Sequence, residues 1–280
     1  MPITIPDVPD TLKAMEQIPI RNPFPGAKAF LVAATPSTQE EAKALASAGY
    51  PAGSLVAAEE QSSGRGRFRG RSWESEAGRN LLFTLYLGKV APPGLPIRIG
   101  LALRRAICDY AAPLAPGFGS RLRLKWPNDL MIDDRKAAGI LCEAAASGVF
   151  AGVGLNCNQD SFPPGLEGRA TSLATELGRE VDRWAILERF LGRLSKGLEA
   201  GPAGDSWSEA AAQVLWKRGE DVAFLPGLAG RAEGSIPLVG ILEGIDAEGS
   251  ILIRAEGEHE ARAYPAGELT AGPGPIRVCS

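Results

Sequence analysis

Residues 121–156 read RLRLKWPNDLMIDDRKAAGILCEAAASGVFAGVGLN, and this stretch decides the fold. From residue 121 to 126, charged and apolar side chains alternate, which is the period of a half-buried strand. Three further apolar runs follow, at residues 130–132, 137–143 and 150–156. The Asp133-Asp134 pair is a turn signal between the first two of these runs. Strands this close in sequence are joined by short turns, and short turns favour antiparallel pairing.

The chain before and after this stretch adds more strands and several helices. Apolar runs predict strands at residues 30–34, 55–58 and 80–87. Helical patterns cover residues 38–47, 97–111, 182–198 and 207–216. For the first helix we expect Ser37 or Thr38 as the cap, Glu41 completing a capping box, and Gly49 as the end. Together these elements predict an α+β fold, with a mixed, largely antiparallel sheet and flanking helices.

The character of the chain changes after about Arg218. Short apolar runs separated by glycine turns lie at residues 222–225, 238–245, 250–254 and 260–264. Such a series is typical of a small β-barrel. We therefore expect a larger domain over residues 1–218 and a small barrel domain over residues 219–280.

Composition and charge narrow the functional classes. The 280 residues are 45% hydrophobic and 22% charged, with a formal net charge of −3, so no basic field points to nucleic acid. The longest apolar runs are too short to span a membrane, and residues 1–10 lack a basic start and an apolar stretch, which predicts a cytoplasmic protein. The only histidine, His259, lies in a polar segment, which makes a Ser-His-Asp or Cys-His mechanism improbable. The four cysteines form no Cys-x-x-Cys pair, so we interpret them as buried apolar side chains.

A loop rich in glycine and arginine is the first candidate for chemistry. Residues 64–73 read GRGRFRGRSW. Glycines let a backbone approach a ligand closely, arginines offer fixed forks to a carboxylate or phosphate, and Trp73 presents a flat face to a purine. Alone, the loop could equally be a solvated basic segment or an RNA-binding one.

A second cluster, KWPND at residues 125–129 followed by DRKAAGIL at 134–141, makes the ligand interpretation stronger. Asn128 and Asp129 lie at a predicted turn, where short polar side chains can hold ribose, phosphate or hydrated magnesium. Lys136 opens the next strand, from which it can point into a cavity and neutralise an anion. Gly139 leaves room beside it. The alternative is an ordinary hairpin with charged ends.

In this order and spacing, the motifs resemble those of biotin–protein ligases, members of the biotin/lipoate A/B protein ligase family. Lys-Trp-Pro-Asn-Asp with Lys136 seven residues after Asp129 is the most specific match, and Gly152-Val-Gly-Leu-Asn156 is a further one. The resemblance covers roughly residues 30–270. It implies a catalytic domain related to class II aminoacyl-tRNA synthetases and a C-terminal SH3-like barrel. It also implies the monofunctional type, because too few residues precede Phe30 for a DNA-binding domain.

The resemblance implies a two-step reaction in which biotin and Mg·ATP form biotinyl-5′-AMP, and a lysine of a biotin carboxyl carrier protein then takes the biotinyl group. The implied catalytic residues are Lys136, Arg65 and Arg67. The implied biotin-binding residues are Ser37, Thr38, Gln61, Gly64 and Gly139. The implied nucleotide-binding residues are Trp73, Lys125, Asn128 and Asn156. Asp129 is the implied magnesium ligand. Fixed cations suit this chemistry because negative charge gathers on the phosphate oxygens.

The chain departs from the family pattern in its glycine-arginine loop, which is one residue longer at Phe68-Arg69, and in Gln39, which stands where asparagine is usual. Three other functions stay open: a ligase for lipoate or octanoate, a divergent ligase of weak activity, and a non-enzymatic RNA or protein binder. The expected partners are the carrier protein and small molecules, without DNA or membrane. The sequence leaves monomer and homodimer open.

Overall fold

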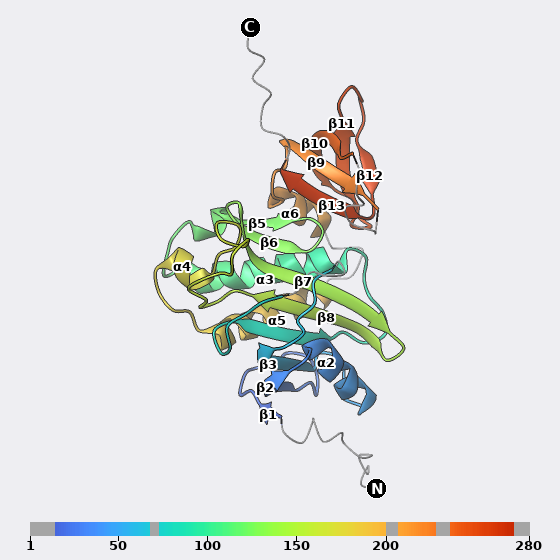
Figure 1. Ribbon diagram of the computed structural model, residues 1–280. Coiled ribbons are helices and arrows are strands. Elements are labelled where there is room, and N and C mark those ends of the chain that lie inside the picture. The colour runs from blue at the N-terminus through green and yellow to red at the C-terminus, as the bar shows by residue number, and fades with distance from the viewer. Residues whose placement is uncertain (1–14, 68–72, 200–206, 228–235, 272–280) are drawn as a thin grey trace.

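The computed structural model describes residues 15–67, 73–199, 207–227 and 236–271. Two sheets dominate the molecule (Figure 1). The larger has eight strands in the order β1-β2-β3-β4-β8-β7-β6-β5, and the smaller has five in the order β12-β11-β10-β9-β13. The α+β prediction is confirmed. No helix in the described ranges is long and apolar enough to cross a membrane.

The larger sheet follows the predicted strand pattern. Its strands are β1 (Glu16–Gln17), β2 (Ala29–Thr35), β3 (Leu55–Gln61), β4 (Leu81–Tyr86), β5 (Leu122–Lys125), β6 (Asp129–Ile132), β7 (Arg135–Ala145) and β8 (Gly148–Leu155). Only β2 and β3 pair in parallel, because α2 (Thr38–Ser47) joins them as a crossover. All other pairs are antiparallel, as the closely spaced runs of residues 121–156 predicted.

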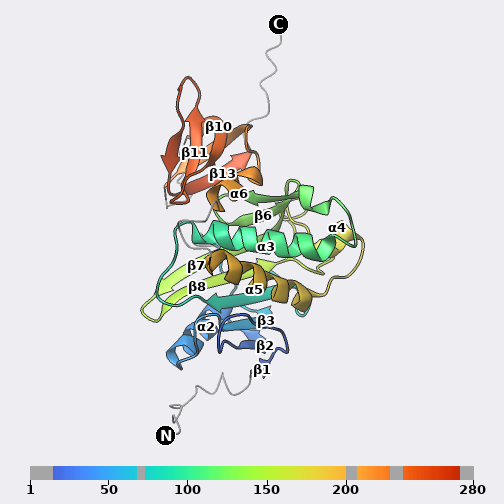
Figure 2. The ribbon, with the colours of Figure 1, turned by 180° about the vertical axis from the view of Figure 1, so that it is seen from behind.

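Helices cover the two faces of this sheet unequally. α3 (Leu95–Ala111) and α5 (Arg183–Glu199) lie side by side across one face, as Figure 2 shows from behind. Their apolar stripes bury the core with Phe83, which packs against Phe190 at 5.4 Å between ring centroids. The opposite face carries α2 near β3, β4 and β8 (Figure 1). The pocket described below lies on that face, beside β7 and β8.

The alternation of side chains along β8 explains why the pocket lies on this face. In β8, Ala151, Val153 and Leu155 are buried in the core, and the alternate positions Gly152 and Gly154 turn the other way. Glycines without side chains leave a depression there, which positions the site described below.

The termini of α2 correct one detail. Ser37 is the cap and Gly49, at φ +86°, follows the helix end, as expected. The expected capping box through Glu41 is wrong. Glu41 Oε1 instead accepts a hydrogen bond from Thr35 Oγ1 at 2.7 Å, because with Ser37 as the cap Glu41 lies one residue beyond the capping-box position.

Some boundaries and short elements differ from expectation. α6 (Trp207–Gln213) ends before the predicted Trp216, because the next residues extend the edge of β5. There Leu124 N donates to Val214 O at 2.8 Å, and Trp216 N donates to Leu124 O at 2.7 Å. The sequence pattern missed the short η1 (Phe118–Ser120) and α4 (Leu173–Leu177).

The smaller sheet holds β9 (Asp221–Pro226), β10 (Leu238–Ile245), β11 (Ile251–Ala255), β12 (Arg262–Tyr264) and β13 (Gly267–Ala271), all antiparallel. The sequence missed β13. This small antiparallel sheet is consistent with the expected SH3-like domain, and in the described residues it is open, with β12 and β13 as its two edges.

Candidate active site

A pocket opens on the glycine-lined face of the larger sheet. It encloses about 580 Å³ of space, part of it open to solvent. Its walls come from the start of α2, the end of β3, β4, β7, β8 and the glycine-arginine loop. The lining residues predicted from the sequence are Ser37, Thr38, Gln61, Arg65, Arg67, Trp73, Asn128, Lys136 and Gly139. Residues from distant segments therefore meet at one place.

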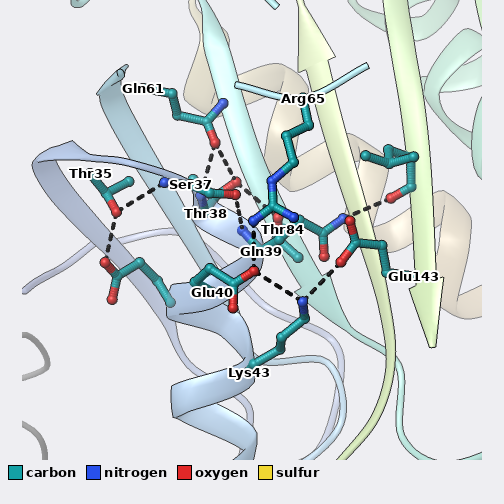
Figure 3. Close-up of polar contacts among 12 residues, drawn as sticks. Thr35, Ser37, Thr38, Gln39, Glu40, Lys43, Gln61, Arg65, Thr84 and Glu143 are labelled. Atoms are coloured by element: carbon teal, nitrogen blue, oxygen red, sulfur yellow. Dashed lines mark hydrogen bonds and ion pairs between the residues drawn. The ribbon is translucent and has the colours of Figure 1, made fainter. Parts of the chain in front are cut away.

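Neutral polar groups from α2, β3 and β4 line one part of the pocket (Figure 3). Gln61 Oε1 accepts from Thr38 N at 2.8 Å and from Thr38 Oγ1 at 3.1 Å. Thr38 Oγ1 also lies 2.8 Å from Thr84 Oγ1. Ser37 Oγ accepts from Gln39 N at 3.3 Å as the helix cap. These bonds fix the start of α2 against the end of β3 and the middle of β4.

Arg65 reaches from its loop to the acidic start of α2. Its Nη2 lies 2.8 Å from Glu40 Oε1, and Lys43 Nζ links Glu40 to Glu143 at 3.2 and 2.9 Å (Figure 3). Hydrogen bonds from Lys43, and next from Arg65, hold the pKa of Glu40 below its usual range. Both Arg65 and Glu40 are about half exposed, so this pair is weak and open to exchange. A phosphate or carboxylate in the pocket can compete for Arg65.

Trp73 fills part of the glycine face. A Cβ built on Gly154 would stand 2.5 Å from Trp73 Cε2, and one built on Gly139 would stand 3.0 Å from Trp73 Cζ3. The room predicted at Gly139 is therefore taken by the indole. Trp73 Nε1 is buried with no hydrogen-bond partner among the described residues. Gly64 does not line the pocket; it packs on the Trp73 backbone, whose N donates to Gly64 O at 2.9 Å.

Lys136 stands beside Trp73 at the cationic end. Its Nζ lies 2.7 Å from Asp129 Oδ1 and 5.6 Å from the centroid of the indole. The register of β6 and β7 brings Asp129 opposite Gly139, within reach of Lys136. The backbone of Lys136 is held on its other side, where Lys136 N donates to Arg169 O at 2.8 Å and Thr171 N donates to Lys136 O at 3.0 Å.

Asn156 supports this arrangement from behind. It lies outside the pocket, and its buried Nδ2 donates to Thr171 O at 3.0 Å. Its backbone N donates to Ala137 O at 2.9 Å. The side chain thus fixes the segment that flanks Lys136. Asn128 lines the pocket, but its Nδ2 donates to Ile140 O at 2.9 Å, which ties the turn to β7.

Lys125 and the smaller sheet lie at the outer side of this end. Lys125 Nζ lies 4.9 Å from the Trp216 ring centroid, and burial lowers the pKa of Lys125 while the nearby Asp129 opposes that shift. Lys125 and Asp129 line a small cleft next to the main pocket. Arg67 Nη2 donates to Gly267 O, at the start of β13, at 2.5 Å. The loop that covers the pocket therefore contacts both sheets.

Residues 31–160 match the model of the biotin/lipoate A/B protein ligase family. The chain is 34% identical over 260 residues to the biotin–[acetyl-CoA-carboxylase] ligase of Paracoccus denitrificans, covering 86% of this chain and all of that protein. With the corresponding ligase of Mycobacterium tuberculosis it shares 32% identity, over 81% of this chain and 83% of that one. This chain belongs to the biotin/lipoate A/B protein ligase family.

Solved structures of the family agree in fold. The biotin protein ligase of Aquifex aeolicus, in complex with biotin and ATP, superposes with a TM-score of 0.71 at 27% identity, covering 86% of this chain and 97% of that one.

The bifunctional ligase/repressor BirA of Bacillus subtilis is 35% identical over 166 residues, which are 55% of this chain. The chain spans about half the length, 49%, of that protein.

Three cationic side chains of the pocket suit the chemistry of this family. Lys136, Arg65 and Arg67 line one pocket and can neutralise a carboxylate and a phosphate brought close together. Such fixed charges suit the activation of an acid by a nucleotide. The lengthened part of the loop, Phe68-Arg69, lies outside the described residues.

The family chemistry implies a magnesium ion, and the carboxylate predicted to bind it is Asp129, beside Lys136. Among the described residues no group of three or more His, Cys, Asp or Glu could hold a metal ion by itself. Mg²⁺ commonly needs only one or two protein carboxylates beside substrate phosphates. Asp129 fits that role chemically, provided that it exchanges Lys136 for the metal.

Sequence reasoning overlooked two polar residues of the pocket. Thr84 interrupts the apolar run of the strand Leu81–Tyr86, and it is fully buried. A lone polar residue inside an apolar strand was the available signal. Gln39 was noted only as a departure from the family pattern, yet it lines the pocket.

Proposed function

We propose that this protein is an ATP-dependent biotin–protein ligase, which converts biotin to biotinyl-5′-AMP and transfers the biotinyl group to a lysine of a biotin carboxyl carrier protein. The observation that carries the proposal is the division of one pocket: neutral hydrogen-bonding groups at the start of α2, and the cations Lys136, Arg65 and Arg67 elsewhere on its wall. An acid with a polar ring and a carboxylate matches both.

In the first step, a carboxylate oxygen of biotin attacks the α-phosphorus of ATP, and the bond from that phosphorus to the pyrophosphate oxygen breaks. Lys136 bridges the carboxylate and the α-phosphate, since both are anions that otherwise repel each other. Arg65 leaves Glu40 for the phosphate, and Arg67 lies beside it. Fixed cations of this kind stabilise the charge that gathers on the phosphate oxygens.

In the second step, the amine of the acceptor lysine attacks the acyl carbon of biotinyl-AMP. The bond from that carbon to the phosphate oxygen breaks, AMP leaves, and the amine loses one proton. Trp73 and the loop of Arg65 and Arg67 keep water from the mixed anhydride. Lys136 also stabilises the departing AMP phosphate.

The remaining assignments follow the same division. Ser37, Thr38 and Gln61 contact the biotin ring. Gly139 lines the pocket, and Gly64 acts through Trp73, on whose backbone it packs. Trp73, Lys125 and Asn128 lie along the nucleotide, while Asn156 acts through the segment beside Lys136, which its side chain holds. Asp129 would hold the Mg²⁺ that accompanies ATP, and that ion would offset the negative charge of the phosphates.

The name of one relative supports a carboxylase carrier domain as the acceptor of the biotinyl group. The Paracoccus denitrificans relative is a biotin–[acetyl-CoA-carboxylase] ligase, and this chain covers its whole length. We assign the same class of acceptor, a carrier domain of a carboxylase, and we place the reaction in the cytoplasm, where ATP and the carrier meet. The domain division near residue 218 is part of the proposal, with catalysis in residues 1–218.

ATP–pyrophosphate exchange with biotin, lipoate and octanoate in parallel tests the proposal. We expect exchange with biotin, little with the other two acids, and transfer of labelled biotin to a carrier domain but not to the same domain with its acceptor lysine changed to arginine. Exchange driven by lipoate or octanoate alone would identify a ligase for another acid. No exchange with any acid would favour a binding protein.

A further inference from the structure

Gln39 carries an unused acceptor inside the pocket. Its side chain is buried, with 5% of the residue exposed, and lines the pocket from the second residue of α2. Its Nε2 donates to Leu141 O at 2.8 Å (Figure 3). Its Oε1 is also buried and has no hydrogen-bond partner among the described residues.

The orientation of this amide follows from its one bond. Leu141 O is a carbonyl oxygen, which only accepts, so the amide nitrogen of Gln39 must face it. Turning the amide over would set two acceptors against each other. The free atom is therefore an oxygen, which calls for an N–H or O–H donor.

The donors of the adjacent Thr38 are already engaged. Thr38 N and Thr38 Oγ1 both point to Gln61 Oε1, and Thr38 Oγ1 shares its other contact with Thr84. A buried carbonyl oxygen without a hydrogen-bond partner is unfavourable, so this atom affects the binding of whatever fills the pocket. A ligand that brings a donor removes this cost, and one that lacks a donor keeps it.

The position of Gln39 fits one end of a long acid. Gln39 Nε2 bonds to Leu141 O, two residues along β7 from Gly139, and a Cβ built on Gly139 would stand 3.2 Å from Lys136 Nζ. About 7 Å of strand therefore separates the position of the Lys136 cation from that of Gln39. Gly152, paired with Leu141, makes room for the side chain, because a Cβ there would stand 2.7 Å from Gln39 Nε2. A carboxylate at Lys136 leaves the far end of the acid near Gln39.

We propose that Gln39 determines acid specificity by accepting a hydrogen bond, through Oε1, from a ring N–H of the substrate. The site then selects a cyclic urea over an acid whose far end is a dithiolane or an alkyl chain, because neither of those can donate. This inference rests on the proposed function, and it adds a residue to which that proposal gave no role.

The test measures the binding of biotin and lipoate by calorimetry to the unaltered protein and to Gln39→Leu. We expect Gln39→Leu to weaken biotin binding roughly 10- to 100-fold while lipoate binding stays the same or improves. The exposed Gln213→Leu is the matched control and should change neither. Equal weakening of both acids would mean a structural role for the bond to Leu141 and would overturn the proposal.

A ligand-side comparison needs no variant. Two cyclic carbamate analogues of biotin, each with one ring N–H replaced by oxygen, keep the shape of the ring. One of them should bind the unaltered protein at least 10-fold more weakly than biotin, and Gln39→Leu should erase most of that difference. If neither analogue is weakened, the inference fails. Failure of biotin itself to bind the unaltered protein would refute the proposed function instead.

Discussion

At the scale of single residues, Lys136 shows how a fold prepares a cation. Its backbone is held through both N and O by residues 169–171, and its Nζ lies between the Asp129 carboxylate and the Trp73 ring. Asp129 balances the charge while no anion is bound. The side chain is about one third exposed, so a ligand can reach it. A cation positioned in this way needs little reorganisation when phosphate arrives.

Lys136→Ala should abolish most of the pyrophosphate exchange while leaving the fold intact. Removing one charge-stabilising group of this kind commonly lowers the rate on the order of 10²–10³-fold. The exposed Lys28→Ala is the control and should keep full activity. Exchange rates and melting temperatures of both variants decide the matter. Near-normal exchange by a stable Lys136→Ala protein would remove Lys136 from the mechanism.

At the scale of elements, the β6–β7 hairpin carries Asp129 and Lys136. Its turn residue Asp133 has φ +52°, a conformation that Asp tolerates better than most side chains. Arg121 bonds to Asp133 at 2.7 Å and also contacts Glu176 at 2.5 Å, and Arg135 contacts Glu176 at 2.6 Å. The buried Glu176 carboxylate thus joins the hairpin to α4, next to the segment that holds Lys136.

Asp133→Asn should give a small, pH-dependent loss of stability. The hydrogen bond from Arg121 lowers the pKa of Asp133, so the native state favours the charged carboxylate. The stabilisation is present above the unfolded pKa of about 3.9 and disappears as pH falls through the lower folded pKa. Because Asp133 is half exposed, we expect less than about 1 kcal/mol.

Urea unfolding of Asp133→Asn and the unaltered protein, from pH 7 down to pH 3, checks this prediction. Asn keeps the left-handed conformation, so the comparison isolates the charge. The difference in unfolding free energy should shrink as the pH falls below 4. A difference that is constant over the whole range would mean that the ion pair is not its source.

At the scale of the whole molecule, the smaller sheet is joined to the larger one at several points. Trp126 Nε1 donates to Gly249 O at 3.0 Å, and its ring meets Phe224 edge-on at 5.9 Å between centroids. Arg67 reaches Gly267 from the loop over the pocket. Apolar residues of both sheets form one continuous core. The smaller sheet is therefore packed against the larger sheet and contacts the loop that lines the pocket.

Gly249→Ala should disturb this junction more than its matched control, Gly257→Ala. Both glycines have positive φ, +92° and +81°, so each variant suffers a backbone penalty of roughly 1–2 kcal/mol. Only at Gly249 would the new Cβ also stand 2.6 Å from the Gly94 Cα, whereas nothing lies within 4 Å at Gly257. We expect an additional loss of about 1–3 kcal/mol for Gly249→Ala. Urea unfolding measures the loss of unfolding free energy in each variant. Equal losses would show that the junction accommodates the new Cβ at Gly249 without cost.

Local patterns determined much of this protein. The alternation and short turns of residues 121–156 predicted the antiparallel strands, because a strand period and a turn depend on a few neighbouring residues. The same stretch indicated Lys136, Asn128 and Asp129 as site residues, and the structure brings the first two to one pocket. The catalytic roles, and the boundary near residue 218, stay predictions.

Other features were decided only by the tertiary structure. Nothing local shows that Trp73 covers Gly139 and Gly154, that Asn156 holds Thr171, or that the buried Gln39 keeps a free oxygen. Local patterns also do not show that Arg67 donates a hydrogen bond to Gly267, 200 residues away in the chain. The sequence determined which side chains were available and at what spacing along each strand. The packing of the sheets and the register of their strands decided which of those side chains face each other, because such contacts arise between segments that local rules do not connect.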